Sequence, residues 1–200
     1  MDKDNLKRWH KRIRIILIII PILTFIWLVN KNLVPSGKLS ANYNLQELSP
    51  YISRLYPAGR VLGVEQSKNG DYYQSIVIDP VYFKVYLPVS FERAKIILKF
   101  QTNKVNNLRL GYQIGPDFQY YFKNVVPIKR EGGWLMSEVD FNLANAYIKD
   151  NKLKFAISSP RLDETEGEIK INSIQVVLEK EPLTIKDVLM LIKKFVKKIL

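Results

Sequence analysis

Residues 81–87 read Val-Tyr-Phe-Lys-Val-Tyr-Leu, a run in which apolar side chains alternate with amphipathic ones. Successive residues of a β-strand point to opposite faces of a sheet. This run therefore places its two valines, Phe83 and Leu87 on one face, and Lys84 with two tyrosines on the other. Such alternation is typical of a half-buried strand of an antiparallel sheet.

The same alternation recurs along most of the chain, with turn residues between the runs. Asn69-Gly70-Asp71 and Glu131-Gly132-Gly133 are typical turn segments. The last run changes phase at Asn172-Ser173, which predicts a bulge there. Many short strands and few helix signals predict a β-sandwich or barrel. The further predicted strands are residues 38–45, 94–100, 108–114, 152–157 and 169–178.

The closing half of this region carries a resemblance. Gly133-Trp134 leads a run that ends at Leu143, a second run follows around Leu153, and Ile171-Asn172-Ser173-Ile174-Gln175-Val176 forms the last strand. This order resembles the final strands of carbohydrate-binding modules of the galactose-binding-like, jelly-roll type, over about residues 78–180. The resemblance implies a mainly β fold, an antiparallel jelly-roll-like β-sandwich, which we expect over residues 58–182.

The N-terminal segment is apolar and uncharged from Ile15 to Val29 and follows a basic run. We expect a transmembrane helix over residues 13–31, with snorkelling Arg and Lys stems at its ends. The basic residues before it place residues 1–12 in the cytoplasm and the main domain outside, as a single-pass protein of the cell membrane. A cleaved signal peptide is the alternative, but the segment lacks a small-residue cleavage site.

Residues 32–57 contain four breakers of regular structure, among them Pro35 and Pro50, and we expect them to form a tether and lead-in. Residues 49–57, coming soon after an anchor, are similar to membrane-anchored bacterial proteins of no known activity. That likeness implies a layout of the chain and no chemistry.

The C-terminal residues 183–200 predict an amphipathic helix that begins at a capping-box-like segment, Thr184 to Asp187. Its lysines border an apolar stripe, which suits a helix lying in a membrane surface; packing on the sandwich or on a partner is the alternative. The residues that we expect to face the membrane are Trp27, Ile185, Leu189, Ile192, Phe195, Val196 and Ile199.

Charge argues against nucleic acid as a partner. The formal net charge of the chain is +12, but +9 of it lies in residues 1–31 and 184–200, at the two apolar ends. A nucleic-acid-binding domain carries its basic excess on the folded unit, whereas basic residues beside apolar segments suit anionic lipid headgroups. Membrane lipid is therefore the expected partner of the two ends.

Few catalytic arrangements are open to this chain. It contains no cysteine, and its one histidine, His10, precedes the predicted anchor. A histidine-based triad, a thiolate metal site and a cysteine nucleophile are thus excluded from the main domain. Glycoside cleavage by paired carboxylates stays open. Its candidates are Asp71, Asp79, Glu138 and Asp140.

Tyrosine gives the strongest indication of a binding surface. Tyr72-Tyr73 and Tyr120-Tyr121 are doublets, so one member of each points outward if the segment is a strand. An exposed aromatic ring can stack on a sugar or anchor a protein, and the alternative is a tyrosine that caps the core with a solvated hydroxyl. The ligand-binding candidates are Tyr72, Tyr73, Arg109, Tyr112, Gln113, Tyr120, Tyr121, Asn124 and Trp134.

The acidic stretch 163–168 is a candidate calcium site through Asp163, Glu164, Glu166 and Glu168, although it lacks EF-hand spacing. A solvated acidic loop is the alternative. No other cofactor is indicated.

The interpretation that follows is a membrane-tethered, non-enzymatic binding or scaffold module of the cell envelope that engages a glycan or an envelope protein. The alternative is an accessory subunit whose helices dock a larger membrane enzyme complex. The identity of the ligand and the oligomeric state do not follow from the residues.

Overall fold

The computed structural model describes residues 3–103, 107–164, 167–184, 186–187 and 190. In the N-terminal helix the described side chains are those of residues 9, 12–28 and 33. The chain divides into two compact units, of which one is Lys38–Glu181 and the other consists of the two ends. Outside the described residues lie most of the positions expected to face a membrane: 185, 189, 192, 195, 196 and 199.

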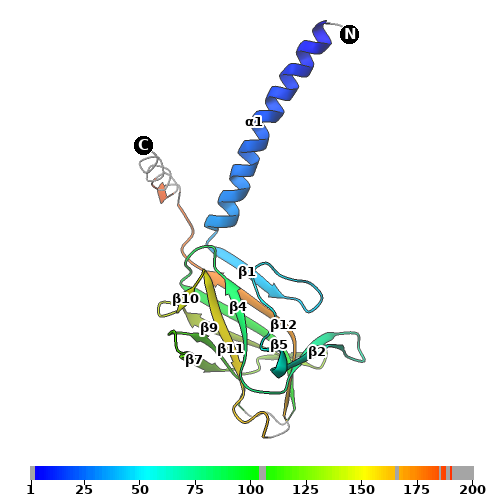
Figure 1. Ribbon diagram of the computed structural model, residues 1–200, viewed down its shortest axis with the longest axis vertical. Coiled ribbons are helices and arrows are strands. Elements are labelled where there is room, and N and C mark those ends of the chain that lie inside the picture. Colours follow the sequence, from blue (N-terminus) through cyan, green and yellow to red (C-terminus); the bar gives the residue numbers. More distant parts are fainter. Residues whose placement is uncertain (1–2, 104–106, 165–166, 185, 188–189, 191–200) are drawn as a thin grey trace. The chain divides into compact units, whose positions relative to one another are not determined.

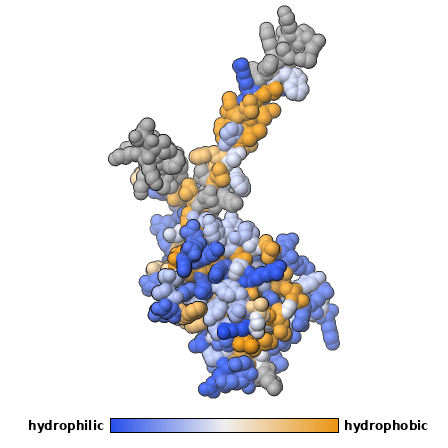
Figure 2. Space-filling model, in the orientation of Figure 1, coloured by the Kyte–Doolittle hydropathy of each residue, from blue (hydrophilic) through white to orange (hydrophobic). Residues whose placement is uncertain are grey.

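The N-terminal end forms a long helix, α1, Lys3–Leu33, which runs through Pro21. From Ile13 to Leu28 its large apolar side chains are 43–64% exposed, and Figure 2 shows them as an orange band. Among the described residues no helix is long and apolar enough to cross a membrane, so the span expected over residues 13–31 remains a prediction.

The larger sheet of the second unit has seven strands, all paired antiparallel. Its main path is β2 (Val61–Gln66), β3 (Tyr72–Ile76), β12 (Glu168–Glu179), β5 (Arg93–Asn103), β9 (Trp134–Asn142) and β8 (Lys129–Glu131). A seventh strand, β1 (Lys38–Tyr43), also pairs with β12. The folded unit thus begins at Lys38 and includes part of the segment expected to be a tether.

One edge of β12 carries two strands in succession. Its first part pairs with β3 and its second part with β1, and the register shifts between Ile171 and Ser173. At that shift the Asn172 Nδ2 donates a hydrogen bond to the carbonyl oxygen of Tyr72 over 2.8 Å. The bulge predicted at Asn172-Ser173 is therefore confirmed, and it lies where the edge partner changes.

The smaller sheet has five strands, also antiparallel. They are β4 (Val81–Tyr86), β11 (Lys152–Ser158), β6 (Arg109–Gln113), β7 (Tyr120–Asn124) and β10 (Ile148–Lys149). Residues 51–56 extend along β4, and the Tyr56 backbone N–H donates to the Tyr82 oxygen over 2.9 Å. The short helix η1, Ala58–Arg60, follows this segment.

The two sheets pack face to face and form one core. The alternation that predicted β4 is the burial pattern observed, with Val81, Phe83 and Val85 fully buried. Across the sandwich the ring of Phe155 on β11 lies 6.2 Å from that of Phe141 on β9. Within its own sheet it stacks on Phe83 of β4 at 5.2 Å. The expected mainly β, antiparallel sandwich is confirmed.

Candidate functional site

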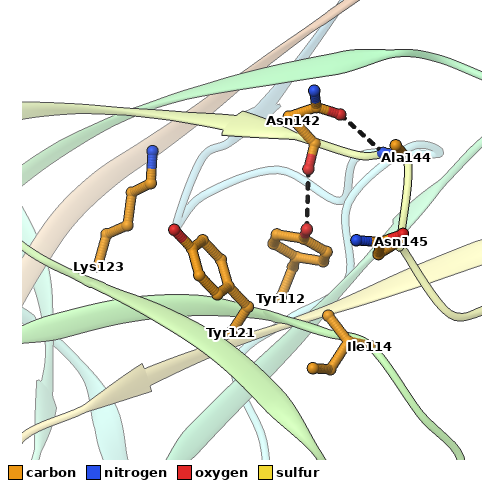
Figure 3. Close-up of a pocket in the computed structure, with 7 residues that line it drawn as sticks. All are labelled: Tyr112, Ile114, Tyr121, Lys123, Asn142, Ala144 and Asn145. Atoms are coloured by element: carbon orange, nitrogen blue, oxygen red, sulfur yellow. Dashed lines mark hydrogen bonds between the residues drawn. The ribbon is translucent and has the colours of Figure 1, made fainter.

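A pocket of about 390 Å³ lies at the edge of the five-stranded sheet, and we call it the rim pocket (Figure 3). Strands β6 and β7 supply its aromatic wall, whereas the end of β9 and the residues that follow supply its polar wall. It is lined by Tyr112, Ile114, Tyr121, Lys123, Asn142, Ala144 and Asn145.

The polar wall of the rim pocket is held by two hydrogen bonds around Asn142. The buried Tyr112 hydroxyl donates to the Asn142 backbone oxygen over 2.8 Å, and the Ala144 N–H donates to Asn142 Oδ1 over 2.9 Å. Neither bond uses the Asn142 amide nitrogen, which can therefore donate to a ligand. Burial, followed by the nearby Tyr121, raises the pKa of Tyr112, so its hydroxyl stays protonated as a donor at neutral pH.

Tyr121 is the exposed aromatic residue of the rim pocket. Its side chain belongs to the inner face of β7, but β7 is an edge strand, so the ring is 48% exposed. The ring packs edge-to-face on Tyr112 at 5.8 Å and 61°, which fixes its orientation. An oriented, half-exposed ring can stack on the apolar face of a sugar, and the amide groups beside it can form hydrogen bonds with the sugar hydroxyls.

Lys123 closes one side of the rim pocket. Its ammonium group donates to the Asp140 backbone oxygen over 2.7 Å and lies 5.6 Å from the centre of the Phe141 ring. The lysine is therefore positioned by the backbone and by an aromatic face. It adds a fixed positive charge next to Tyr121.

The outer face of the five-stranded sheet carries a row of aromatic residues. Ala156 and Gly111 are opposite each other in the register between Tyr82 and Phe122, and these two small residues leave room above the sheet. Tyr82 stacks on Tyr120 at 5.7 Å over that space. We call this set the aromatic row; its members are Tyr56, Tyr82, Tyr120 and Phe122.

The aromatic row is packed against itself. Within the described chain the buried hydroxyls of Tyr56 and Tyr120 have no hydrogen-bond partner, nor has the Nε of Arg109, whose guanidinium lies 5.2 Å from the Phe122 ring. Burial raises the pKa of Tyr56 to about 12 and that of Tyr120 in the same direction, so both stay neutral. Tyr120 and Arg109 thus pack against the outer face of the sheet. Asn124, which is opposite Arg109 in the register, is exposed.

Gln113 is buried and serves the local fold. Its Nε2 donates to the Gly115 oxygen over 2.6 Å, which holds the turn after β6.

Three predicted ligand residues lie on the other sheet. Trp134, expected to contact a ligand, is only 2% exposed, and its Nε1 donates to Asp71 Oδ2 over 2.9 Å. On β9 it is out of phase with Val139 and Phe141, which face the core, and it is buried where it packs against Tyr73 and Asp71. We therefore assign it a structural role. Tyr73 packs 6.1 Å from the Trp134 ring and donates its hydroxyl to Glu65. Tyr72 is 37% exposed and borders a separate pocket of about 270 Å³ beside β1.

The four carboxylates considered for glycoside cleavage each have a local role. Asp71 accepts the Trp134 bond, and Asp79 accepts bonds from the Ser159 N–H over 2.7 Å and from the Ser158 hydroxyl. Glu138 pairs with Lys95 at 3.2 Å. Asp140 is exposed on β9 and also helps to raise the pKa of Lys95, after the Glu138 hydrogen bond.

The expected calcium ligands do not converge within the described chain. Glu164 lies 3.8 Å from Arg161, Glu168 pairs with Lys170 at 3.5 Å, and Asp163 is exposed. Glu166 lies outside the described residues. Over the described part of the chain no group of three acidic or histidine side chains is placed to hold a metal ion.

Sequence reasoning missed the polar residues that line the rim pocket, namely Lys123, Asn142 and Asn145. Asn142 closes the alternating run that ends at Leu143, which was the only signal for it. Nothing in the linear order indicates that this strand end meets β7.

Comparison with known proteins matches no family model and no curated protein. Solved structures that resemble the chain include a family 6 carbohydrate-binding module of a marine laminarinase from Zobellia galactanivorans, with 13% identity and a TM-score of 0.41 over 72% of this chain and 99% of that one. A xylan-binding family 22 module from Paenibacillus barcinonensis has 14% identity and a TM-score of 0.44 over 72% and 94%.

A third similar structure is a family 36 module of a xylanase from the hindgut metagenome of Trinervitermes trinervoides, with 11% identity and a TM-score of 0.36 over 70% of this chain and 95% of that one. Because these identities and TM-scores are low, we infer function from the geometry of the chain itself. The chain is thus a β-sandwich that resembles carbohydrate-binding modules.

Proposed function

We propose that this protein is a non-catalytic glycan-binding module held at the cell membrane, and that Tyr121 in the rim pocket is the residue on which a sugar ring stacks. The observation that carries the proposal is the pairing of a half-exposed, oriented aromatic ring with the amide nitrogen of Asn142, which neither hydrogen bond of the polar wall uses.

A sugar ring matches this pocket in chemistry and in size. One face of a pyranose presents C–H groups that pack on an aromatic ring, and its rim presents hydroxyls that need donors and acceptors. Tyr121 and Ile114 supply the apolar contact, while Asn142 and the exposed Asn145 supply the amides. The volume of about 390 Å³ lies within the range of roughly 300–1,000 Å³ found for small-ligand sites.

The Tyr121→Ala variant is expected to bind a glycan at least about tenfold more weakly than the unchanged protein, because it lacks the stacking ring and the apolar area that the ring provides. The ligand is first found on a glycan array with the full chain in a neutral detergent, and its affinity is then measured by calorimetry. Unfolding in urea serves as a check, since a half-exposed ring contributes little to the core.

Tyr72→Ala is the matched control, since Tyr72 is a tyrosine of similar exposure on the other sheet. Its affinity is expected to stay unchanged. If Tyr72→Ala abolishes binding and Tyr121→Ala preserves it, the site belongs beside β1 and the assignment to the rim pocket is wrong.

Membrane attachment by α1 is the second part of the proposal. It is supported by the apolar side chains that α1 leaves exposed between Ile13 and Leu28, with Trp27 near their end. The uncharged segment Ile15–Val29 is about 23 Å long at about 1.5 Å per residue, so the proposal requires the stems of flanking basic residues such as Arg14 to extend it toward the roughly 30 Å hydrocarbon core. The basic residues before it favour a cytoplasmic N-terminus.

Deleting residues 1–31 is expected to move the protein from the membrane pellet to the supernatant after cell fractionation, since the exposed apolar helix is removed. The full chain is expected to stay in the pellet through an alkaline carbonate wash. N-terminal sequencing of the mature protein tests the remaining alternative: a start beyond about residue 29 would indicate a cleaved signal peptide. Release of the uncleaved full chain by carbonate would contradict the anchor.

A further inference from the structure

Four lysines surround a second cavity, of about 380 Å³, on the five-stranded sheet. Lys84 comes from β4, Lys149 from β10, and Lys152 and Lys154 from β11. We call it the lysine cavity. Asp150 is the one acidic residue that lines it among the described residues, together with Gln113, Pro116 and Tyr147.

Asp150 offsets one of the four positive charges of the lysine cavity, but within the described chain no carboxylate forms an ion pair with any of these lysines. Two of them lie over aromatic rings instead. Lys84 lies 5.4 Å from the centre of the Tyr56 ring, and Lys154 lies 5.8 Å from that of Tyr82 and 5.0 Å from that of Phe118. These rings hold the ammonium groups in place without neutralising them.

The lysines also repel one another. Burial is the main cause that lowers the pKa of Lys154, and the charges of Lys84 and Lys149 add to it. A bound oxyanion would offset this repulsion, because it accepts charge-assisted hydrogen bonds from several ammonium groups at once.

The lysine cavity and the rim pocket lie at the same end of β6, on its two faces. Gln113 lines the lysine cavity, and the next residue, Ile114, lines the rim pocket. The segment from Ala144 to Tyr147 contributes to both, and the Tyr147 N–H donates to the Gln113 oxygen over 2.8 Å. A polymer that bends around this end of β6 can therefore contact both Tyr121 and the lysines.

We propose that the glycan bound by this protein is anionic, and that the lysine cavity takes its sulfate, phosphate or carboxylate group while a neighbouring ring stacks on Tyr121. The identity of the polymer rests on the proposed glycan binding. A phospholipid headgroup carries the same phosphate chemistry, but the aromatic rim pocket at the same end of β6 favours a polysaccharide.

The test compares dextran sulfate with neutral dextran, which share one backbone and differ in charge, using the full chain in a neutral detergent. The double variant Lys84→Gln with Lys154→Gln is expected to bind dextran sulfate at least about tenfold more weakly, because a single charge-assisted hydrogen bond is worth that much or more. The matched control is Lys68→Gln with Lys99→Gln, which removes the same charge from outside the five-stranded sheet. It is expected to keep the original affinity.

Equal binding of dextran sulfate by both double variants, or no binding by the unchanged protein, overturns the inference. The glycan found on the array separates the two proposals. If the Lys84 and Lys154 double variant still binds it and Tyr121→Ala does not, the proposed role of the lysines is wrong and the proposed glycan binding at the rim pocket is supported. Lysine-dependent binding to vesicles of phosphatidylglycerol in phosphatidylcholine, with none to dextran sulfate, assigns the cavity to a lipid headgroup and overturns the polysaccharide assignment.

Discussion

Trp134→Ala is expected to lower the free energy of unfolding by about 3–5 kcal/mol, the cost of removing a large buried aromatic side chain. Trp134 is 2% exposed and packs against the Tyr73 ring at 6.1 Å. The change also removes the donor of the 2.9 Å hydrogen bond that Asp71 accepts. Urea unfolding followed by circular dichroism measures the effect.

Trp134→Phe is the companion variant, since it keeps an aromatic ring but has no indole N–H. We expect it to be destabilised by roughly 1–3 kcal/mol, mainly through the unpaired Asp71 carboxylate. Neither variant is expected to change glycan affinity under conditions where it is folded. Weaker glycan binding by a Trp134 variant of unchanged stability would indicate that Trp134 contacts the ligand and would contradict its structural role.

Gly111→Val is expected to lower the free energy of unfolding by roughly 1–3 kcal/mol and to weaken glycan binding at the rim pocket. A Cβ atom at Gly111 would lie 2.6 Å from Phe122 Cδ1 and 2.8 Å from the Tyr121 backbone oxygen. The ring can turn aside, but the backbone oxygen moves only if β7 separates from β6. Because β7 carries Tyr121, a displacement of β7 also moves Tyr121 in the rim pocket.

Gly63→Val is the matched control, since a Cβ at Gly63 has no heavy atom of the described chain within 4 Å and the residue lies on β2 of the other sheet. Its stability and glycan affinity are expected to stay close to the original. A Gly111→Val protein with unchanged unfolding and unchanged calorimetric affinity would show that the close approach of β6 and β7 is unimportant.

Local alternation predicted the strands well. The runs at residues 81–87, 94–100, 152–157 and 169–178 are strands β4, β5, β11 and β12. The change of phase in the last run also predicted the bulge at Asn172. The alternation is a property of neighbouring residues, because a strand with one face in the core requires a period of two.

The site was only partly predictable. Tyr112 and Tyr121 were candidates because doublets and alternating aromatics can expose a ring, and both line the rim pocket. Trp134 satisfied the same reasoning and is buried. The difference is that Trp134 packs against Tyr73 of β3, whereas Tyr121 lies on the edge strand β7. The alternation of residues along one strand does not determine such contacts between distant strands.

What the sequence determined by itself was the fold class, an antiparallel β-sandwich, and the side of each strand that faces the core. Only the tertiary structure decided which strands form edges and which strand ends meet. Asn142, Tyr121 and Ile114 come from separate segments, and the four lysines come from three strands. Side-chain period depends on residues next to each other in the chain, whereas a pocket depends on pairing between distant strands, which is set by the packing of the whole core.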